Sequence, residues 1–284
     1  MNPTLCSQSY NISDREFQLF RNIIFRETGI HMSDRKRNMI VARLSKRLRA
    51  LNLSSFSDYY HYLNESSDAG NELINLINRI TTNKTDFFRE RHHFEFLLSE
   101  ALPTIMEGAR SGREKRLRIW SAGCSSGEEP YSIAMTVREA FHNERGWDIK
   151  ILATDLDTEI LAQASRGIYP SQQIIPVPMS YITKYFVRRT EGYEAGPQIK
   201  NMISFRKLNL MDALFPMKKP FDIIFCRNVM IYFNEQTKAE LVKKFHLHLK
   251  QDGYMLIGHS ESLMHAKHLF TFIKHTIYRK VQHV

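Results

Sequence analysis

The stretch Leu117–Pro130, LRIWSAGCSSGEEP, decides the fold of this chain. Its apolar residues predict a short strand, the small residues after them a tight turn, and Pro130 the first residue of a helix. Glycines let a backbone approach a ligand, and the free N–H groups of a helix start attract polar ligand atoms. Glu128 and Glu129 would repel a pyrophosphate and suit a cation, such as the ammonium of an amino-acid-like cofactor. These residues leave a cofactor cradle and an ordinary strand–turn–helix connection equally open.

The length and composition indicate a two-domain protein of the cytoplasm. A chain of 284 residues can form a large α/β domain and a smaller one. The first thirty residues lack a signal-peptide pattern, and no apolar run reaches transmembrane length. Cys6, Cys124 and Cys226 are far apart, which indicates neither a disulfide framework nor a zinc site. We expect no metal, because the histidines lack ligand spacing and His92–His93 is interpreted as a helix start.

Residues 1–80 predict a small all-α domain. Ser13 and Glu16 form a capping-box pattern before an amphipathic helix that Gly29 ends. A second helix is expected from Ser33 to Ala50. Two further helical segments are expected over residues 56–63 and 71–80, with a turn over residues 66–70.

The second of these helices carries a local positive charge. Residues 35–49 hold seven Lys or Arg residues and no acidic residue, whereas the rest of the first ninety residues carry more acidic than basic side chains. The apolar residues of this helix fall on one arc, and Arg43, Lys46, Arg47 and Arg49 lie on the other. The face is interpreted as a docking surface or as an ordinary solvated surface, and the residues alone slightly favour the second.

From Leu117 onward, strand and helix patterns alternate through a domain expected over residues 91–284. The second strand ends at Asp155, where nucleotide-binding α/β domains hold ribose hydroxyls; a helix cap is the alternative, which the upstream glycine turn disfavours. Prolines and glycines interrupt the alternation over residues 166–203, which predicts an inserted antiparallel β-subdomain. A terminal hairpin over residues 270–279 then predicts a mostly parallel sheet whose last strand is antiparallel.

The segment TTNKTDFFRE, residues 81–90, joins the two domains. It could be a plain linker anchored by its two phenylalanines. It could also offer Asn83, Thr85 and Arg89 to the neighbouring site, with Arg89 suited to gripping a carboxylate. The residues alone favour the linker.

Four segments in this order, TTNKTDFFRE, WSAGCSSGEEPYSIA, ATDLDTEILAQASRGIY and FDIIFCRNVMIYF, followed by GHSES, resemble the CheR family of chemoreceptor glutamate methyltransferases. The resemblance covers residues 13–280. It implies an α/β, Rossmann-like class I S-adenosylmethionine-dependent methyltransferase fold, with the β-subdomain inserted and the all-α domain in front. It also implies methyl transfer from S-adenosylmethionine to receptor glutamate carboxylates, which yields methyl esters and S-adenosylhomocysteine.

The resemblance assigns roles to individual residues. Arg89 would bind the methionine carboxylate of the cofactor, Glu129 its ammonium and Asp155 its ribose. Tyr232 would orient the reactants at the methyl group, with Arg89 in a secondary role near the incoming carboxylate; the alternative is that both only bind cofactor. The remaining cofactor contacts would be Asn83, Thr85, Asn209, Leu210, Arg227 and Asn228. The joining segment then belongs to the site and is not a linker.

The resemblance also implies the partner. Receptor methylation regions are acidic helical bundles, so Arg43, Lys46, Arg47 and Arg49 would steer docking by charge. We expect a monomer that associates with clusters of membrane receptors. Some family members also grip a receptor C-terminal peptide at the β-subdomain, and the short loop over residues 188–200 leaves this open here.

Parts of the sequence are also compatible with two other functions. A nucleic-acid methyltransferase could use the basic helix on phosphates, but that helix lacks interleaved aromatic residues, so no nucleic-acid partner is expected. A non-catalytic cofactor-binding scaffold is disfavoured because Arg89, Glu129, Asp155 and Tyr232 are all present. The segment RNVMIYF also differs from the Asn-Pro-Pro-aromatic type of amide and amino methylation, which favours an oxygen acceptor.

Overall fold

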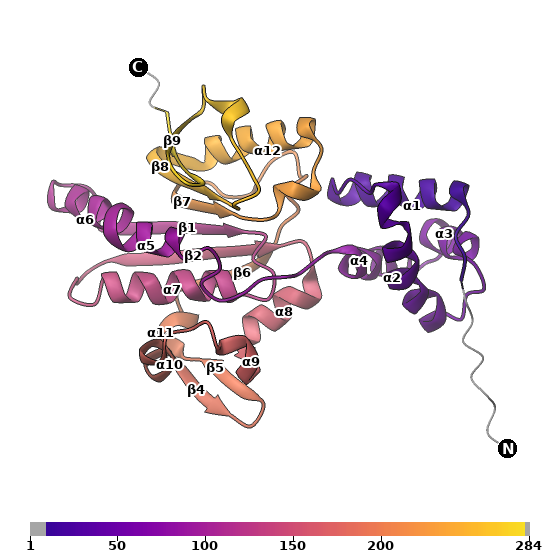
Figure 1. Ribbon diagram of the computed structural model, residues 1–284, viewed down its shortest axis with the longest axis horizontal. Helices are drawn as coiled ribbons and strands as arrows, with labels where there is room; N and C mark the ends of the chain where they lie inside the picture. The colour runs from indigo at the N-terminus through magenta and orange to yellow at the C-terminus, as the bar shows by residue number, and fades with distance from the viewer. Residues whose placement is uncertain (1–9, 282–284) are drawn as a thin grey trace. The chain divides into compact units, whose positions relative to one another are not determined.

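The computed structural model describes residues 10–281, so Cys6 lies outside the described part (Figure 1). Internal contacts divide the chain into two compact units, with the boundary between Thr82 and Asn83. Among the described residues, no helix combines the length and apolar character needed to cross a membrane. Cys124 and Cys226 are buried free thiols.

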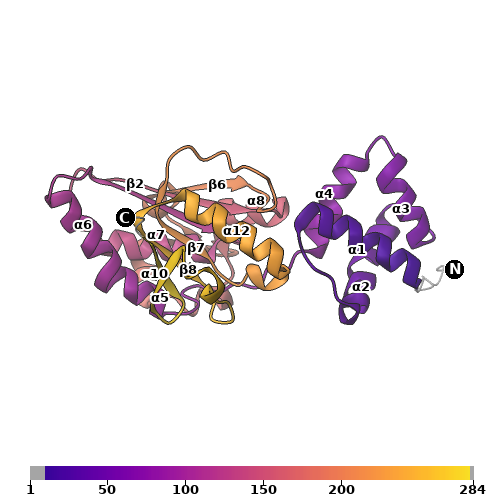
Figure 2. The ribbon, with the colours of Figure 1, turned by 90° about the horizontal axis from the view of Figure 1, so that it is seen from above.

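The first unit is a bundle of four helices (Figure 2). They are α1 (Asp14–Thr28), α2 (Arg37–Ala50), α3 (Phe56–Glu65) and α4 (Ala69–Ile80), with a short 3-10 helix, η1 (Asp34–Lys36), before α2. The predicted capping box is present, since Ser13 and Glu16 exchange side chain to backbone hydrogen bonds, and Gly29 ends α1 in the left-handed conformation. The predicted turn over residues 66–70 is too long, because α4 already begins at Ala69.

The core of the bundle contains a buried ionic cluster. Tyr59 stacks on Phe20 with ring centroids 5.6 Å apart, and its hydroxyl donates to Glu72 Oε1 at 2.7 Å. Arg47 reaches the same carboxylate with two hydrogen bonds, Nε to Oε1 at 2.9 Å and Nη2 to Oε2 at 2.6 Å. Burial alone would raise the pKa of Glu72, but the hydrogen bonds from Arg47 and Tyr59 outweigh it and hold the pKa below its ordinary value. Glu72 is therefore ionised and paired.

Two residues of the predicted docking face thus serve the bundle itself. Arg47 is held by Glu72. Arg43 donates from Nη1 to the carbonyl oxygens of Ile80 at 2.6 Å and Thr81 at 2.8 Å, at the C-terminal end of α4. Lys46 and Arg49 are exposed. The positive surface that α2 offers is consequently narrower than the sequence pattern indicates.

The second unit is built on a seven-stranded sheet in the order β6-β2-β1-β7-β8-β10-β9. Its strands are β1 (Arg116–Ala122), β2 (Asp148–Asp155), β6 (Ile203–Lys207), β7 (Phe221–Cys226), β8 (Leu249–Ile257), β9 (Phe270–Lys274) and β10 (Ile277–Lys280). The five strands from β6 to β8 are parallel, and β10 is antiparallel to both of its neighbours. This confirms the predicted Rossmann-like fold class.

Helices cover both faces of the sheet (Figure 1). They include α5 (His92–Phe96), the π-helical turn η2 (Leu97–Ala101), α6 (Leu102–Arg110), α7 (Glu128–Ala140), α8 (Thr158–Arg166) and α12 (Glu235–His248). Neighbouring residues of a strand point to opposite faces. Ile119 therefore packs in the core that contains α7 residues, while Trp120 packs on Phe245 of α12 at 5.2 Å between ring centroids. The helix start predicted at His92 is confirmed.

The insertion forms a small sheet of order β3-β5-β4. Its elements are β3 (Ile168–Tyr169), α9 (Ser171–Ile174), α10 (Met179–Tyr185), β4 (Phe186–Arg189), β5 (Gly192–Ala195) and α11 (Pro197–Lys200). The predicted antiparallel β-subdomain is confirmed. The strand that follows the insertion, β6, belongs to the main sheet, where it pairs with β2.

Two local predictions were wrong. The helix α7 begins at Glu128, so Pro130 is its third residue and not its first. Proline is tolerated anywhere in the first turn, which is why it marks a helix start only approximately. The residue pair Asp252-Gly253 also predicts a turn from the sequence, but it lies inside β8, where Asp252 has φ +64° and the pairing with β7 shifts register.

We predict that Glu72→Gln destabilises the helical unit by about 2 kcal/mol, because it leaves the Arg47 guanidinium without its ionic partner. The value lies below that of a fully buried pair, since Arg47 keeps partial solvent contact with a side chain that is 19% exposed. Urea unfolding followed by circular dichroism measures the effect. The stabilisation is present above the ordinary pKa of 4.5 and is lost as the pH falls through the lowered pKa of Glu72.

The matched control is Glu65→Gln on α3, whose carboxylate is exposed and contacts only His61 among the ion pairs described. It should change the stability by less than about 0.5 kcal/mol. Equal effects of the two substitutions at neutral pH would contradict a special role for Glu72.

Candidate functional site

The candidate site lies at the carboxyl edge of the parallel strands. Because β1, β2, β7 and β8 run in the same direction, the segments that follow them meet at one edge. These segments are the glycine turn 123–127, Asp155, the loop 227–232 and the loop 258–261. Ligands of open α/β sheets bind at this edge, so the topology brings together motifs that are separated in sequence.

Backbone strain gathers at the same edge. Four non-glycine residues of these and adjoining segments have positive φ: Phe88 at +54°, Glu90 at +57°, Ser125 at +51° and Asn228 at +59°. Such conformations cost of order 1–3 kcal/mol each for most side chains and persist where surrounding contacts enforce them. Their concentration at this edge is typical of a functional site.

The glycine turn is packed too closely for other residues. A Cβ atom at Gly123 would lie 2.4 Å from Val229 Cγ2, and one at Gly127 would lie 2.8 Å from the Tyr169 hydroxyl. Tyr169, in the inserted subdomain, donates from that hydroxyl to the carbonyl oxygen of Ser126 at 2.8 Å. The turn is therefore fixed on one side by the loop after β7 and on the other by the insertion.

The two glutamates after the turn have different environments. Glu128 is buried and accepts a hydrogen bond from the Ser126 hydroxyl at 2.6 Å. Glu129 accepts from the Ser121 hydroxyl at 2.7 Å and from Arg227 Nη1 at 3.1 Å. Burial raises the pKa of Glu129, and Arg227 opposes that rise. Glu129 is thus the carboxylate that shares a buried cation and keeps unused acceptor capacity.

Asp155 occupies the end of β2 as predicted. Its Oδ2 accepts from the Ser125 N–H at 2.8 Å and its Oδ1 from the Asp157 N–H at 3.0 Å. Burial raises the pKa of this carboxyl group. The cap of α8 is the next acid, Asp157, whose side chain accepts from the N–H groups of Glu159 and Ile160. The helix-cap alternative for Asp155 is therefore wrong.

The joining segment is bonded along its length to this edge. Asn83 donates to Asp157 Oδ2 at 2.7 Å, and its carbonyl accepts from the Ser125 hydroxyl at 3.0 Å. The Phe88 N–H donates to the Ser132 hydroxyl at 3.0 Å, and the Arg89 carbonyl accepts from Arg227 Nη2. Thr85 is half-buried between these anchors. Residues 83–90 thus form part of the larger unit, and the plain-linker interpretation is wrong.

The other predicted residues lie on two loops of the same edge. Asn209 Oδ1 accepts from the Met211 N–H at 3.0 Å, and the Leu208 N–H before it donates to the Asp155 carbonyl at 3.0 Å. Leu210 is buried. Asn228 directly follows Arg227, and Tyr232 lies half-buried at the end of the 3-10 helix η3 (Met230–Tyr232). The Arg89 side chain donates to the Lys84 carbonyl at 3.1 Å within its own segment.

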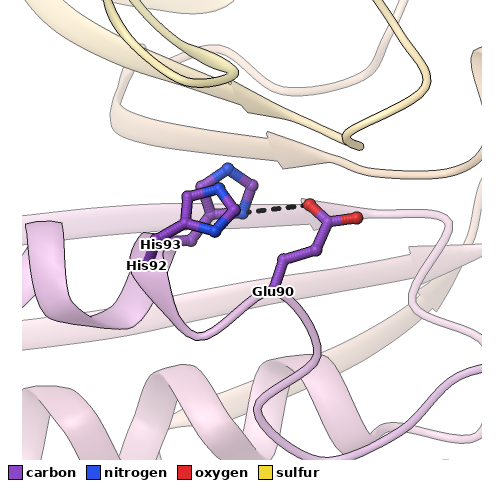
Figure 3. Close-up of side chains that lie close together, drawn as sticks. All are labelled: Glu90, His92 and His93. Atoms are coloured by element: carbon purple, nitrogen blue, oxygen red, sulfur yellow. Dashed lines mark ion pairs between the residues drawn. The ribbon is translucent and has the colours of Figure 1, made fainter.

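A cluster that the sequence did not predict adjoins Arg227. Figure 3 shows Glu90, His92 and His93, whose ligand-type atoms all lie within 4.8 Å of one another. Glu90 Oε2 lies 3.5 Å from His93 Nδ1 and 3.3 Å from Arg227 Nη2. Burial lowers the pKa of His93 to about 2, so this imidazole is neutral. The guanidinium already holds the carboxylate, which makes the cluster a poor match for a divalent cation.

The charge balance of the edge suits S-adenosylmethionine. Two carboxylates, those of buried Glu129 and half-buried Glu90, share the single guanidinium of Arg227, which leaves an excess of negative charge. The Nε atom of Arg227 and Oε2 of Glu90 are also buried without a hydrogen-bond partner among the described residues. The cofactor carries an ammonium and a sulfonium against one carboxylate, so its net charge is complementary.

Sequence reasoning missed Glu90, Ser125, Tyr169 and Glu261. Glu90 ends the quoted segment TTNKTDFFRE, and Glu261 lies in GHSES, so the signal was present without a chemical role attached. Nothing in the local pattern of Tyr169 distinguishes it from an ordinary core residue.

Comparison with known proteins agrees with this geometry. A family model described as "CheR methyltransferase, SAM binding domain" matches residues 83–279, and one described as "CheR methyltransferase, all-alpha domain" matches residues 15–81. A "Chemotaxis protein methyltransferase" of Borreliella burgdorferi is 44% identical over 272 residues, covering 95% of each chain. That of Escherichia coli is 40% identical, covering 94% of this chain and 91% of the relative. "Chemotaxis protein methyltransferase 2" of Pseudomonas aeruginosa is 38% identical, covering 97% and 96%.

The two matched regions meet at the same boundary as the two structural units, and the relatives span both. The resemblance identified from the sequence is thereby confirmed. This chain belongs to the CheR methyltransferase family, as a chemotaxis protein methyltransferase with an S-adenosylmethionine-binding domain.

Proposed function

We propose that the chain methylates glutamate side-chain carboxylates of chemotaxis receptors and forms methyl esters. The observation that carries the proposal is the shared cation at the carboxyl edge, where Glu90 and Glu129 surround Arg227 beside the loop that ends in Tyr232. The names of the relatives support methyl transfer in chemotaxis, and the resemblance of the quoted sequence motifs implies the receptor as the substrate. The segment RNVMIYF carries a phenol after β7 and differs from the Asn-Pro-Pro-aromatic type of amide and amino methylation, which supports an oxygen acceptor.

The residues of this chain would bind and orient the reactants. Glu129 would accept from the ammonium of the cofactor, Asp155 from its ribose hydroxyls, and Arg89 would pair with its carboxylate. Asn83, Thr85, Asn209, Leu210, Arg227 and Asn228 complete the proposed cofactor set. When bound, S-adenosylmethionine supplies an electrophilic methyl group on its sulfonium sulfur.

The acceptor needs no general base. A glutamate side chain with an ordinary pKa of about 4.3 is ionised at neutral pH and can attack the methyl carbon directly. The new O–C bond forms as the C–S bond breaks, and the electron pair stays on the sulfur of S-adenosylhomocysteine, so no proton is transferred. Tyr232 would orient the acceptor by hydrogen bonding, which is catalysis by positioning. We propose that no metal is required, because neither reactant needs further polarisation.

The reaction class is tested by transfer of radiolabelled methyl from S-adenosylmethionine to chemoreceptor-containing membranes. We expect the label on the receptor to be released as volatile methanol by brief alkaline treatment, because esters hydrolyse in base. Transfer should be unchanged by a metal chelator. Label that survives alkali would identify an amide or amine product and overturn the proposal. Transfer to nucleic acid, or tight cofactor binding without any transfer, would support the alternatives.

Cofactor affinity should weaken as the pH falls from neutrality. Burial raises the pKa of Glu129 and of Asp155, so protons neutralise these carboxylates before ordinary ones as the solution becomes acidic. Each protonation removes a negatively charged hydrogen-bond acceptor for the cofactor. We expect Glu129→Gln to raise the Kd for S-adenosylhomocysteine by about 10- to 100-fold, because one charge-assisted hydrogen bond is lost. The substitution should also flatten the pH dependence of this Kd.

Titration calorimetry at several pH values measures both effects. Glu159→Gln, an exposed carboxylate on α8, is the matched control and should behave like the parent protein. An identical pH slope for Glu129→Gln and the parent would count against the ammonium contact.

Receptor docking is proposed to use the exposed basic residues of α2. Since Arg43 and Arg47 are bound within the bundle, reversing their charge would also damage the fold. We therefore predict that Lys46→Glu with Arg49→Glu lowers receptor methylation several-fold at low salt and little at high salt, because screening removes the attraction between exposed charges. Initial rates of methyl transfer at two ionic strengths measure this.

The control is Lys218→Glu with Lys219→Glu. These exposed lysines precede β7, at the end of the strand opposite the candidate site. The control changes the net charge equally and should leave the salt dependence intact. A similar loss in both double variants would show that only net charge matters, and would refute docking by α2.

A further inference from the structure

The loop that carries Tyr232 is held by a buried carboxylate with no role in the proposed cofactor set. Glu261 is 9% exposed and lies in the segment GHSES after β8. Its Oε2 accepts from the N–H groups of Asn228 at 3.0 Å and Gly258 at 2.6 Å. Its Oε1 accepts from the Ile231 N–H at 3.2 Å. One side chain therefore fixes the backbone at both ends of the segment between Asn228 and Tyr232.

The segment 258–261 and the loop after β7 are also in direct contact. A Cβ atom at Gly258 would lie 2.8 Å from the Asn228 N atom and 2.5 Å from its Nδ2 atom, so only glycine allows this approach. On the other side, His259 contacts Glu90 Oε1 with its N–H and its Nδ1 atom, each at 3.2 Å. The segment 258–261 thus connects the joining segment to the loop after β7.

The arrangement has an energetic reason. Asn228 has φ +59°, a conformation that needs support, and a charged acceptor that receives several backbone N–H groups supplies it. Among the described residues, no ion pair involves Glu261, and its carboxylate accepts hydrogen bonds from backbone N–H groups. Its negative charge is used to order a loop.

We propose that Glu261 is a positioning residue for methyl transfer. Its carboxylate holds the loop from Asn228 to Tyr232 and thereby places the Tyr232 phenol at the acceptor side of the site. The inference rests on the proposed orienting role of Tyr232 and extends it to a residue that touches neither reactant.

The substitution Glu261→Gln replaces one of the two carboxylate oxygens by an NH2 group and so tests their roles separately. The amide keeps the size of the side chain and one acceptor oxygen, which is best used where two N–H groups converge, from Asn228 and Gly258. The new NH2 group then faces the Ile231 N–H, donor against donor, next to Tyr232. The substitution should therefore loosen the end of the loop that carries Tyr232 while retaining the Asn228 end.

We expect kcat for receptor methylation to fall by about 10- to 100-fold in Glu261→Gln, the usual effect of a small misplacement in a reacting geometry. The Kd for S-adenosylhomocysteine should change by less than about threefold, and the melting temperature should fall by only a few degrees, because one buried N–H group loses its acceptor. Wild-type kcat, or an equal loss of cofactor affinity, would overturn the proposal. Should Glu261→Gln not fold, Glu261→Asp keeps the charge, withdraws the oxygens by one methylene, and should show the same split.

Glu235→Gln is the matched control. Glu235 lines the same surface pocket as Glu261, beside Met230 and Ile231, but its side chain is 82% exposed and pairs with Lys238 on its own helix. The same chemical change there should leave kcat and Kd as in the parent protein. A loss of kcat equal to that of Glu261→Gln would assign the effect to the charge of the pocket and refute the positioning role.

A double-mutant cycle with Tyr232→Phe tests the route of the effect. If Glu261 acts through the phenol, Glu261→Gln should lower kcat by less than about threefold once the hydroxyl is absent. A full additional loss, or a Tyr232→Phe variant as active as the parent, would overturn the proposal.

Hydrogen exchange separates this inference from the proposed function, because it needs no acceptor. Amides of residues 228–232 should exchange faster in Glu261→Gln than in the parent, while those of residues 83–90 should not change. Unchanged exchange at residues 228–232 would refute the positioning role even in an active enzyme. A parent protein that fails to methylate receptors would instead refute the proposed function.

Discussion

The site depends on one buried guanidinium. Arg227, whose side chain is 3% exposed, binds Glu129 at the start of α7, Glu90 in the joining segment and the carbonyl oxygen of Arg89. Removing an ionic group from water is costly unless its partners replace the lost solvation. The folded chain must therefore bring two distant segments, the joining segment and the start of α7, to the end of β7 before this charge is satisfied. In doing so it assembles the edge that would bind the cofactor.

The charges around Arg227 explain why this edge suits a cationic ligand. Two carboxylates share one cation, so each remains partly unsatisfied in a region with little water. A ligand that carries an ammonium and a sulfonium completes the balance. The residues with positive φ, Phe88, Glu90, Ser125 and Asn228, lie in segments of the same edge, where surrounding contacts enforce the conformation.

The basic helix α2 shows how a correctly predicted pattern can assign too many residues to a docking surface. The periodicity correctly separates an apolar face from a basic one, and Ile40, Leu44 and Leu48 are fully buried. Two of the basic residues are nevertheless used inside the bundle, by the carboxylate of Glu72 and by the carbonyl groups that end α4. Arginine is long enough to leave its own face and reach such partners, so a helical projection places its Cβ atom but not its charge.

The sequence alone determined the fold class of this protein and many of its helices and strands. Periodicity and capping signals act within a few residues, which is why α1, the glycine turn, Asp155 and the terminal hairpin could be predicted, while Pro130, Gly70 and Asp252 misled by only a few positions. Tertiary structure alone decided which side chains meet. Glu129 and Arg227 are 98 residues apart, and Glu261 lies 33 residues beyond Asn228. The physical reason is that burial makes a polar group depend on a particular partner, and the sheet topology, not the local sequence, chooses that partner.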